Sequence, residues 1–230
     1  MATNYGTPPI VKDGLVFAVD PINFRSYTSG STTVTDQIGG KSGTVQGSGA
    51  GVVPLNGLWD MDASSDTGIV FSEHADFNFG TGDFALDFWM RVDGQNNAGS
   101  PGQITRIVCG DETTDTTGYL VMYYQNSMTF FSNSTISQVA VDAGVLYHIV
   151  FSRISGTLKG YRNGVEADSD SFTNNLSNLT PFGIGRSVRS GYTNAGVLDG
   201  AVGPVKIYKG KGLTAEEVLQ NYNALKGRFS

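Results

Sequence analysis

The stretch DFALDFWMRV, residues 83–92, decides the fold because apolar residues recur in it at every second position. One face of this stretch is entirely apolar, with Phe84, Leu86, Phe88, Met90 and Val92. The opposite face mixes residue types, with Ala85, Asp87, Trp89 and Arg91. A period of two is that of a β-strand, whose successive side chains point to opposite faces of a sheet. The sequence therefore predicts a strand with one face in the core and a second face of mixed character.

Further runs rich in β-branched and aromatic residues are spaced along the chain. They cover residues 14–20, 118–125, 127–131, 136–141, 145–152, 157–164 and 201–209. Clusters of Gly, Asn, Asp and Ser separate these runs, and such residues tolerate turn geometry. Because no helical periodicity lies between the runs, they favour two packed antiparallel sheets over a parallel sheet covered by helices. The predicted fold class is all-β.

Two hairpin reversals are predicted within residues 146–167. The turn pairs are Ser155-Gly156 and Asn163-Gly164, and residues of these types accept the backbone angles of a tight hairpin turn. Three basic residues alternate with apolar ones in the same stretch, and we expect them on the solvent-facing side of the sheet: Arg153, Lys159 and Arg162.

The C-terminal segment departs from the strand pattern. Thr214 and Glu217 form a Thr-x-x-Glu capping box, and Gly227 is the expected helix stop. One helical face between them is apolar, with Val218, Leu219, Tyr222 and Leu225. The sequence predicts a short helix over about residues 214–226 that packs against an edge or open end of the sandwich.

The N-terminal segment, residues 1–13, is predicted to be an extended arm that contains Pro8 and Pro9. Such an arm docks either on a neighbouring subunit or on its own domain, and the sequence leaves both open. Residues 14–230 then form a single β-sandwich domain that includes the helix, since a chain of 230 residues fits one domain of this class.

Composition excludes several classes of function. The formal net charge is −6 and only 16% of residues are charged, whereas nucleic-acid binding depends on clustered Lys and Arg. No apolar run reaches the roughly 18 residues that a membrane helix needs, and the first residues lack the charged and apolar regions of a signal peptide. We expect no nucleic-acid or membrane partner and synthesis without a signal peptide. The single cysteine, Cys109, is expected to be a buried apolar side chain.

Six segments, in order, resemble the laminin-G-like branch of the concanavalin A-like lectin/glucanase superfamily. They are GLVFAVDPINFRSY (14–27), TVTDQIGGKSGTV (33–45), FNFGTGDFALDFWMRV (77–92), LYHIVFSRISGTLKGYRNGV (146–165), FGIGRS (182–187) and LDGAVGPVKIYKGKGLTAEEVLQNYNALKGRF (198–229). Together they span about residues 14–229. The resemblance implies a jelly-roll sandwich of two curved antiparallel sheets, which agrees with the strand pattern.

The ending LTAEEVLQNYNALKGRF, residues 213–229, looks most like the versions of this domain in structural proteins of tailed bacteriophages. The resemblance implies a protein made in the host cytoplasm and displayed on the virion surface. The leading expectation is a non-enzymatic structural protein of the particle, for head decoration rather than the tail, because the chain has no fibre repeats or coiled-coil heptads. Its expected partners are other capsid or tail proteins and further copies of itself, with weak binding to a cell-surface glycan.

Two other functions stay open: a lectin module of a tail, host-adhesion or bacterial surface protein, and a glycoside hydrolase. Retaining glucanases of the superfamily carry paired glutamates on one strand, and the Glu-x-Asp-x-Glu run that this requires is absent. The acidic residues Asp111, Glu112 and Asp115 have the wrong spacing. The two histidines, His74 and His148, accompany no Gly-x-Ser-x-Gly motif. We therefore expect no enzymatic activity.

Calcium is the one cofactor that the sequence leaves open. Laminin-G-like relatives often bind it through aspartates near strand ends, which makes Asp20 and Asp36 the candidate ligands. The last-strand position where relatives often have aspartate is Gly203 here, followed by Pro204. This departure favours Asp20 and Asp36 as turn caps and a chain without a cofactor.

Glycan binding would fall to loops or to the concave face of a sheet. Aromatic rings with a polar edge stack on sugars, and Arg and Asn side chains hydrogen-bond to sugar hydroxyls. The candidate ligand-binding residues are Tyr27, Arg186, Arg189, Tyr192 and Asn194. The alternative is that the tyrosines cover strand edges or subunit contacts.

Overall fold

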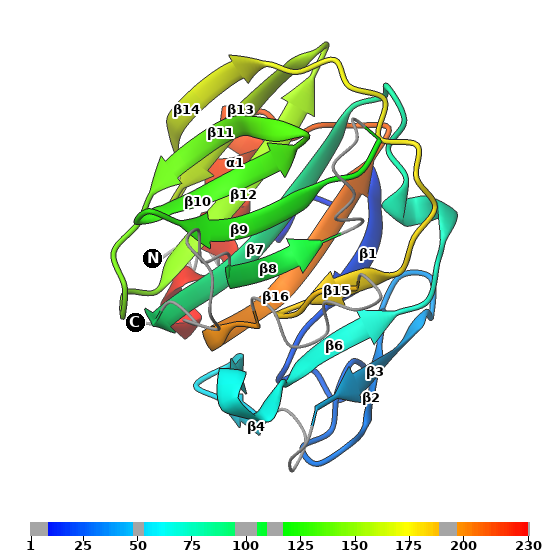
Figure 1. The fold of residues 1–230 in the computed structure, drawn as a ribbon, viewed down its shortest axis with the longest axis vertical. Coiled ribbons are helices and arrows are strands. Elements are labelled where there is room, and N and C mark those ends of the chain that lie inside the picture. Colours follow the sequence, from blue (N-terminus) through cyan, green and yellow to red (C-terminus); the bar gives the residue numbers. More distant parts are fainter. Residues whose placement is uncertain (1–8, 48–52, 95–104, 110–116, 189–196, 230) are drawn as a thin grey trace, which may run out of the picture.

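Two antiparallel β-sheets pack face to face, and a C-terminal helix lies on the outer face of one of them (Figure 1). The computed structural model describes residues 9–47, 53–94, 105–109, 117–188 and 197–229. This arrangement confirms the predicted all-β, two-sheet antiparallel sandwich with a short C-terminal helix. No helix among the described residues is long and apolar enough to cross a membrane.

Sheet A has eight strands. In spatial order they are β14 (Val165–Ser171), β13 (Thr157–Arg162), β12 (Tyr147–Ile154), β7 (Phe84–Gly94), β16 (Asp199–Lys209), β5 (Leu58–Met61) and β4 (Val53–Leu55), and β1 (Leu15–Val19) also pairs with β16. The central pair, β7 and β16, consists of the two longest strands. Both of the predicted hairpin turns flank β13, and their residues Ser155, Gly156, Asn163 and Gly164 have positive φ.

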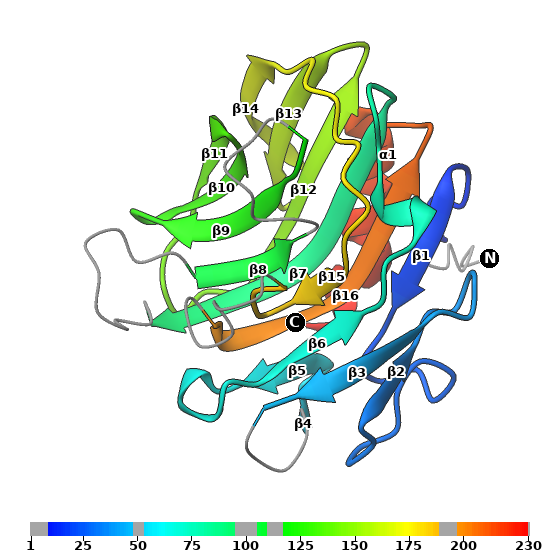
Figure 2. The same cartoon turned by 45° about the vertical axis from the view of Figure 1, so that its right-hand side comes forward.

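Sheet B also has eight strands and faces sheet A across the core (Figure 2). Its order is β11 (Ser134–Ala140), β10 (Ser127–Ser132), β9 (Leu120–Tyr124), β8 (Thr105–Cys109), β15 (Phe182–Ile184), β6 (Gly68–Phe71), β3 (Ser42–Gln46) and β2 (Thr33–Thr35). Two short 3-10 turns, η1 (Ala63–Ser65) and η2 (Ala75–Phe77), flank β6. Cys109 is the last residue of β8, but its side chain lies outside the described part of the structure.

The core between the sheets is rich in aromatic rings. Phe17 lies edge-on to Phe71 with 4.9 Å between ring centroids, and Phe77 stacks on Phe182 at 4.8 Å. Such arrangements add a specific attraction to the gain from burial. The apolar face of β7 joins this cluster, as its alternation predicts: Phe84, Leu86, Phe88, Met90 and Val92.

Most of the second face of β7 is buried too, because the helix α1 (Ala215–Leu225) covers it. The predicted position of the helix at an edge or open end of the sandwich was therefore wrong: its buried side chains, Val218 and Asn221, contact central strands of sheet A. The capping box is formed as predicted: Thr214 accepts from the backbone of Glu217, whose side chain accepts from the backbone of Thr214. The α-helix ends at Leu225, but Gly227 does not end the helical backbone as the sequence predicted. Lys226 keeps right-handed helical angles, and a 3-10 turn, η3 (Lys226–Arg228), follows. This continuation carries the last described residues back across the sheet.

A carboxylate, Asp87, lies at the centre of the interface between sheet A and α1. Lys206 Nζ donates to its Oδ1 at 2.6 Å, His148 Nε2 lies 3.1 Å from the same oxygen, and Asn221 Nδ2 donates to Oδ2 at 2.7 Å. All four residues are buried. Burial alone would raise the pKa of Asp87, but the charges of Lys206 and His148 outweigh it and hold the pKa well below its ordinary value. A buried charge thus joins β7, β12, β16 and α1.

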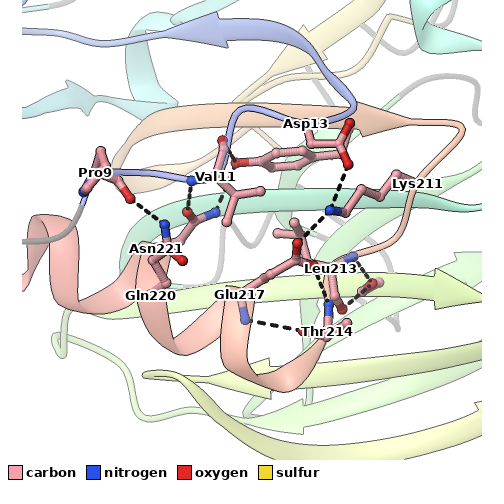
Figure 3. Close-up of polar contacts among 11 residues, drawn as sticks. Pro9, Val11, Asp13, Lys211, Leu213, Thr214, Glu217, Gln220 and Asn221 are labelled. Atoms are coloured by element: carbon pink, nitrogen blue, oxygen red, sulfur yellow. Dashed lines mark hydrogen bonds and ion pairs between the residues drawn. The ribbon is translucent and has the colours of Figure 1, made fainter.

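The N-terminal segment docks on the same helix (Figure 3). Asn221 Oδ1 accepts from the backbone N–H of Val11 at 2.8 Å, and the Tyr208 hydroxyl donates to the carbonyl of Val11 at 3.0 Å. Residues 9–13 therefore rest on their own domain, which is one of the two dockings that the sequence left open. Residues 1–8 lie outside the described structure.

Arg153 corrects one expectation. It was predicted on the solvent-facing side of the sheet, but it is 1% exposed. Its guanidinium donates to the backbone carbonyls of Gly80, Gly82 and Asn174. Because three loop carbonyls supply the acceptors that a buried guanidinium requires, the charge is tolerated inside. Lys159, by contrast, stays partly exposed, with 40% of its side chain accessible.

Replacing Asp87 with alanine should destabilise the protein by about 3 to 5 kcal/mol, because Lys206 would keep a buried charge without its partner. Urea unfolding followed by fluorescence measures the difference. Glu166→Ala is the matched control: it breaks the Lys159–Glu166 ion pair, whose side chains are each 40% exposed, and should cost less than about 1 kcal/mol. Equal losses in the two variants would contradict the role of Asp87.

Candidate ligand-binding cleft

Two of the five residues predicted to bind a glycan lie in the described structure, and both are buried. Tyr27 is 4% exposed, its ring lies edge-on to Trp59 at 6.0 Å, and burial raises the pKa of its phenol. Arg186 is also 4% exposed, and its guanidinium donates to the backbone carbonyl of Asp66 at 3.0 Å and to its carboxylate at 3.3 Å. The structure places both side chains in packing and ion-pair roles rather than together on one open surface.

The other three predicted residues, Arg189, Tyr192 and Asn194, fall within residues 189–196, outside the described structure. Their role stays a prediction. The neighbouring residue, Val188, packs against Leu120 and Met122 on the outer face of sheet B.

The two candidate calcium ligands already have cationic partners. Both oxygens of Asp20 accept from the guanidinium of Arg228 at 2.8 Å, and Asp36 accepts from Lys41 Nζ at 3.0 Å. Each also caps a turn by accepting backbone N–H groups, which confirms the turn-cap interpretation. Calcium requires carboxylate oxygens that are free to coordinate it, so these residues do not fit the ion. Across the described ranges, no group of three or more His, Cys, Asp or Glu side chains is placed to hold a metal.

A cleft of about 410 Å³ lies where η3 returns across the end of sheet A. Its lining comes from five distant parts of the sequence: Ile22, Asn56, Gly57, Leu58, Arg91, Leu146, Arg228 and Phe229. Asn56 and Gly57 form the tight turn between β4 and β5 and both have positive φ. A side chain at Gly57 would collide with the guanidinium of Arg228, so glycine lets this arginine lie against the turn.

The two arginines of the cleft are both neutralised by carboxylates. Arg228 makes the two hydrogen bonds to Asp20 and a third to the carbonyl of Gly57 at 2.6 Å. Arg91 donates from Nε and Nη2 to Asp93 at 2.5 and 2.6 Å, and this pairing raises its pKa. Bidentate pairs of this kind hold their side chains in one orientation. The cleft therefore presents ordered polar groups with little net charge.

An aromatic wall supports the other side of the cleft. Phe229 lies 4.5 Å from the ring of Trp89, which in turn stacks on Tyr222 of α1 at 5.7 Å. Leu58 is buried in the same cluster, and Leu146 packs against it. Because each ring is held by the next, the wall is fixed in position before any ligand arrives.

This lining suits a ligand that has both an apolar face and several hydroxyl groups. An aromatic ring beside a hydrogen-bonding turn and two guanidinium–carboxylate pairs offers stacking together with donors and acceptors. Among the described residues, the lining contains no carboxylate and no Ser, Cys or His side chain that could act as a nucleophile. It can bind and orient a ligand, but its own side chains offer no acid and nucleophile pair.

None of the cleft residues was predicted as a site from the sequence. Five separate segments meet there, and no spacing along the chain predicts that they do. The one local signal is the Asn56-Gly57 pair, which marks a turn but not a ligand.

The comparison with curated proteins found no match. Among solved structures, the binding domain of Paraclostridial Mosquitocidal Protein 1 is similar with a TM-score of 0.67 at 16% identity, covering 91% of this chain and 52% of that one. The binding domain of Botulinum Neurotoxin DC in complex with SialylT has a TM-score of 0.66 at 13% identity, covering 93% and 52%. This chain thus spans about half the length of each toxin domain.

Domain 4 of AbnA, a GH43 extracellular arabinanase from Geobacillus stearothermophilus, in complex with arabinotriose, has a TM-score of 0.62 at 15% identity, covering 90% of this chain and 98% of that one. At such identities the likenesses concern the fold alone. The family model described as the concanavalin A-like lectin/glucanases superfamily matches residues 63–219. With two packed antiparallel sheets and a family match over most of its length, this chain belongs to the concanavalin A-like lectin/glucanases superfamily.

Proposed function

We propose that this protein is a non-catalytic carbohydrate-binding module whose cleft beside Phe229 takes a neutral sugar. The cleft carries this proposal: it combines a fixed aromatic wall with the Asn56-Gly57 turn and two arginines that are already paired with carboxylates. A sugar offers an apolar ring face to Phe229 and hydroxyls to the polar groups. Since the arginine charges are neutralised, an acidic sugar gains no advantage over a neutral one.

The lining of the cleft is the reason for proposing that the module is not catalytic. Retaining hydrolysis of a glycosidic bond needs two carboxyl groups facing each other about 5 Å apart across the substrate. The carboxylates of Asp20 and Asp93 are not part of the described lining, and each is already bonded to an arginine of the cleft. The solved domains of similar fold include two that are described as binding domains, which supports the same proposal.

Two variants test the cleft. Asn56→Gly removes the amide while keeping a residue that accepts positive φ, and Phe229→Leu removes the ring while keeping apolar volume. Each should weaken binding of neutral oligosaccharides such as arabinotriose by about tenfold, the worth of one hydrogen bond or one stacking contact. A glycan array followed by calorimetric titration measures this. Val165→Ala, on the exposed edge strand β14 at the other end of sheet A, is the control and should bind normally.

The proposal fails if no neutral oligosaccharide binds, or if the cleft variants bind as well as the parent protein. Release of reducing ends from any oligosaccharide on the array would replace it with a hydrolase function.

Binding should also be independent of calcium, because Asp20 and Asp36 are occupied by Arg228 and Lys41. Adding a chelator or millimolar calcium should change neither the melting temperature nor the glycan affinity. Differential scanning fluorimetry and repeated titrations measure both. A rise in melting temperature with calcium that disappears in Asp36→Asn would contradict this expectation.

A second proposal concerns the setting in which the module works: the outside of a tailed-phage particle, as a head-decoration protein in contact with other virion proteins and with further copies of itself. The ending LTAEEVLQNYNALKGRF favours it by its resemblance to phage structural proteins. An exposed apolar surface supports such contacts. It is formed by Ile22, Phe24 and Ile38, which are 59%, 80% and 51% exposed and whose two loops are joined by the Asn23–Gln37 hydrogen bond.

Under this second proposal the protein should copurify with intact particles at high copy number. Mass spectrometry of gradient-purified particles measures the copy number, and Phe24→Ser with Ile38→Ser should lower it severalfold without unfolding the chain, because both side chains are exposed. Particles that lack the protein altogether would exclude the virion setting and leave the carbohydrate proposal standing.

A further inference from the structure

A second concavity of about 300 Å³ lies on the outer face of sheet A, next to the first residue of α1. It is lined by Ser152, Ile154, Thr157, Lys159, Tyr161 and Ala215, and is called here the Tyr161 groove. It shares no lining residue with the cleft at Phe229. All of its residues lie in the described structure.

The register of β12 and β13 places these side chains on one face. Ile154 pairs with Thr157 and Ser152 with Lys159, and directly opposed residues share a side of the sheet. The helix begins only at Ala215, so it covers the ring of Tyr161, which packs with Leu213 and Val218, but leaves the strands beyond it open. The groove lies between the N-terminal end of α1 and the part of the sheet that the helix does not cover.

The hydroxyl of Tyr161 is the unusual feature of this groove. Tyr161 is 2% exposed, yet its hydroxyl makes no hydrogen bond to any described residue. Other buried tyrosines behave differently: the hydroxyls of Tyr119, Tyr123, Tyr147 and Tyr208 all donate to protein acceptors. The hydroxyl is not completely sealed from solvent, and because Tyr161 lines the groove, we infer that it opens into the groove. A polar group that is held rigidly and left unsatisfied is ready to bond a ligand.

The charges around this hydroxyl limit what it can bind. Burial raises the pKa of Tyr161, Glu166 and Glu216 raise it further, and Lys159 lowers it, so the phenol keeps its proton at neutral pH and can donate. Lys159 is itself paired with Glu166 at 2.9 Å. The carboxylates of Glu166 and Glu216 outnumber the single ammonium group of Lys159, so the groove disfavours an anionic ligand. The groove therefore suits an uncharged ligand rich in hydroxyl groups.

We propose that the Tyr161 groove is a second sugar-binding site, in which the Tyr161 hydroxyl, Thr157 and Lys159 bond the hydroxyls of a neutral saccharide. This inference rests on the proposed carbohydrate-binding function and extends it to two sites, one beside the first residue of α1 and one beside η3, which follows the helix. The ring of Tyr161 is held by the helix, so the site supplies a preformed hydrogen bond rather than a stacking surface.

The test is a titration of the labelled protein with arabinose, galactose and glucose, and separately with glucuronate, followed by NMR. At least one neutral sugar should shift the resonances of residues 157–161 and 215–216, and glucuronate should shift them less. Tyr161→Phe should weaken this binding by about tenfold, the worth of one hydrogen bond, while its melting temperature stays that of the parent because the ring is kept. Tyr208→Phe, whose hydroxyl is bonded inside the protein, should lower the melting temperature without changing the groove shifts.

The outcomes separate the two proposals. If neutral sugars shift only residues around Phe229 and Asn56, the cleft stands and the Tyr161 groove is refuted. If they shift only the groove, the cleft proposal fails and this one stands. If no sugar shifts the resonances of the groove residues, or if Tyr161→Phe binds as tightly as the parent protein, the groove is not a sugar-binding site and the proposal is refuted.

Discussion

The buried carboxylate of Asp87 organises the outer layer of this sandwich. Lys206, His148 and Asn221 converge on it from two strands and the helix, and a buried charge tolerates no arrangement that leaves it unpaired. This requirement fixes where α1 sits on sheet A. The position of α1 in turn sets where η3 returns, and with it the places of Arg228 and Phe229 in the cleft. The Tyr161 groove borders α1 itself, and the cleft borders η3, which follows α1.

The parts of the structure that follow a local rule were predictable. Alternation along residues 83–92 gave the core face of β7, and the Thr214–Glu217 spacing gave the start of α1. Long-range pairing was not predictable: Asn221 lies 134 residues from Asp87, and a polar residue on the buried side of a helix breaks the apolar pattern. Arg153 was misplaced for the same reason, since its acceptors are carbonyls of distant loops.

The candidate site was even harder to predict, because it also depends on contacts between residues that are distant in the sequence. Sequence favoured residues whose types suit sugars, and the structure uses two of them, Tyr27 and Arg186, for packing and ion pairing. The cleft instead depends on a turn, Asn56-Gly57, and on two arginines whose charges are neutralised by aspartates. Asp93 is two residues from Arg91, but Asp20 is 208 residues from Arg228. Residue type indicates what a side chain can do, whereas burial and pairing decide whether it remains free to do it.

The position of Asn221 also has a consequence for the order of assembly. Its amide bonds to Asp87 through the nitrogen and to Val11 through the oxygen. A single side chain of the C-terminal helix therefore holds both the N-terminal segment and the central strand β7. During synthesis the two sheets can pair while the ribosome still holds residues 215–229. Until those residues emerge, Trp89 and Tyr208 lack their contacts with Tyr222 and Asn221, and Val11 lacks its hydrogen bond to Asn221. The outer layer therefore forms late in folding, and a chain truncated before the helix would expose an apolar surface that favours aggregation.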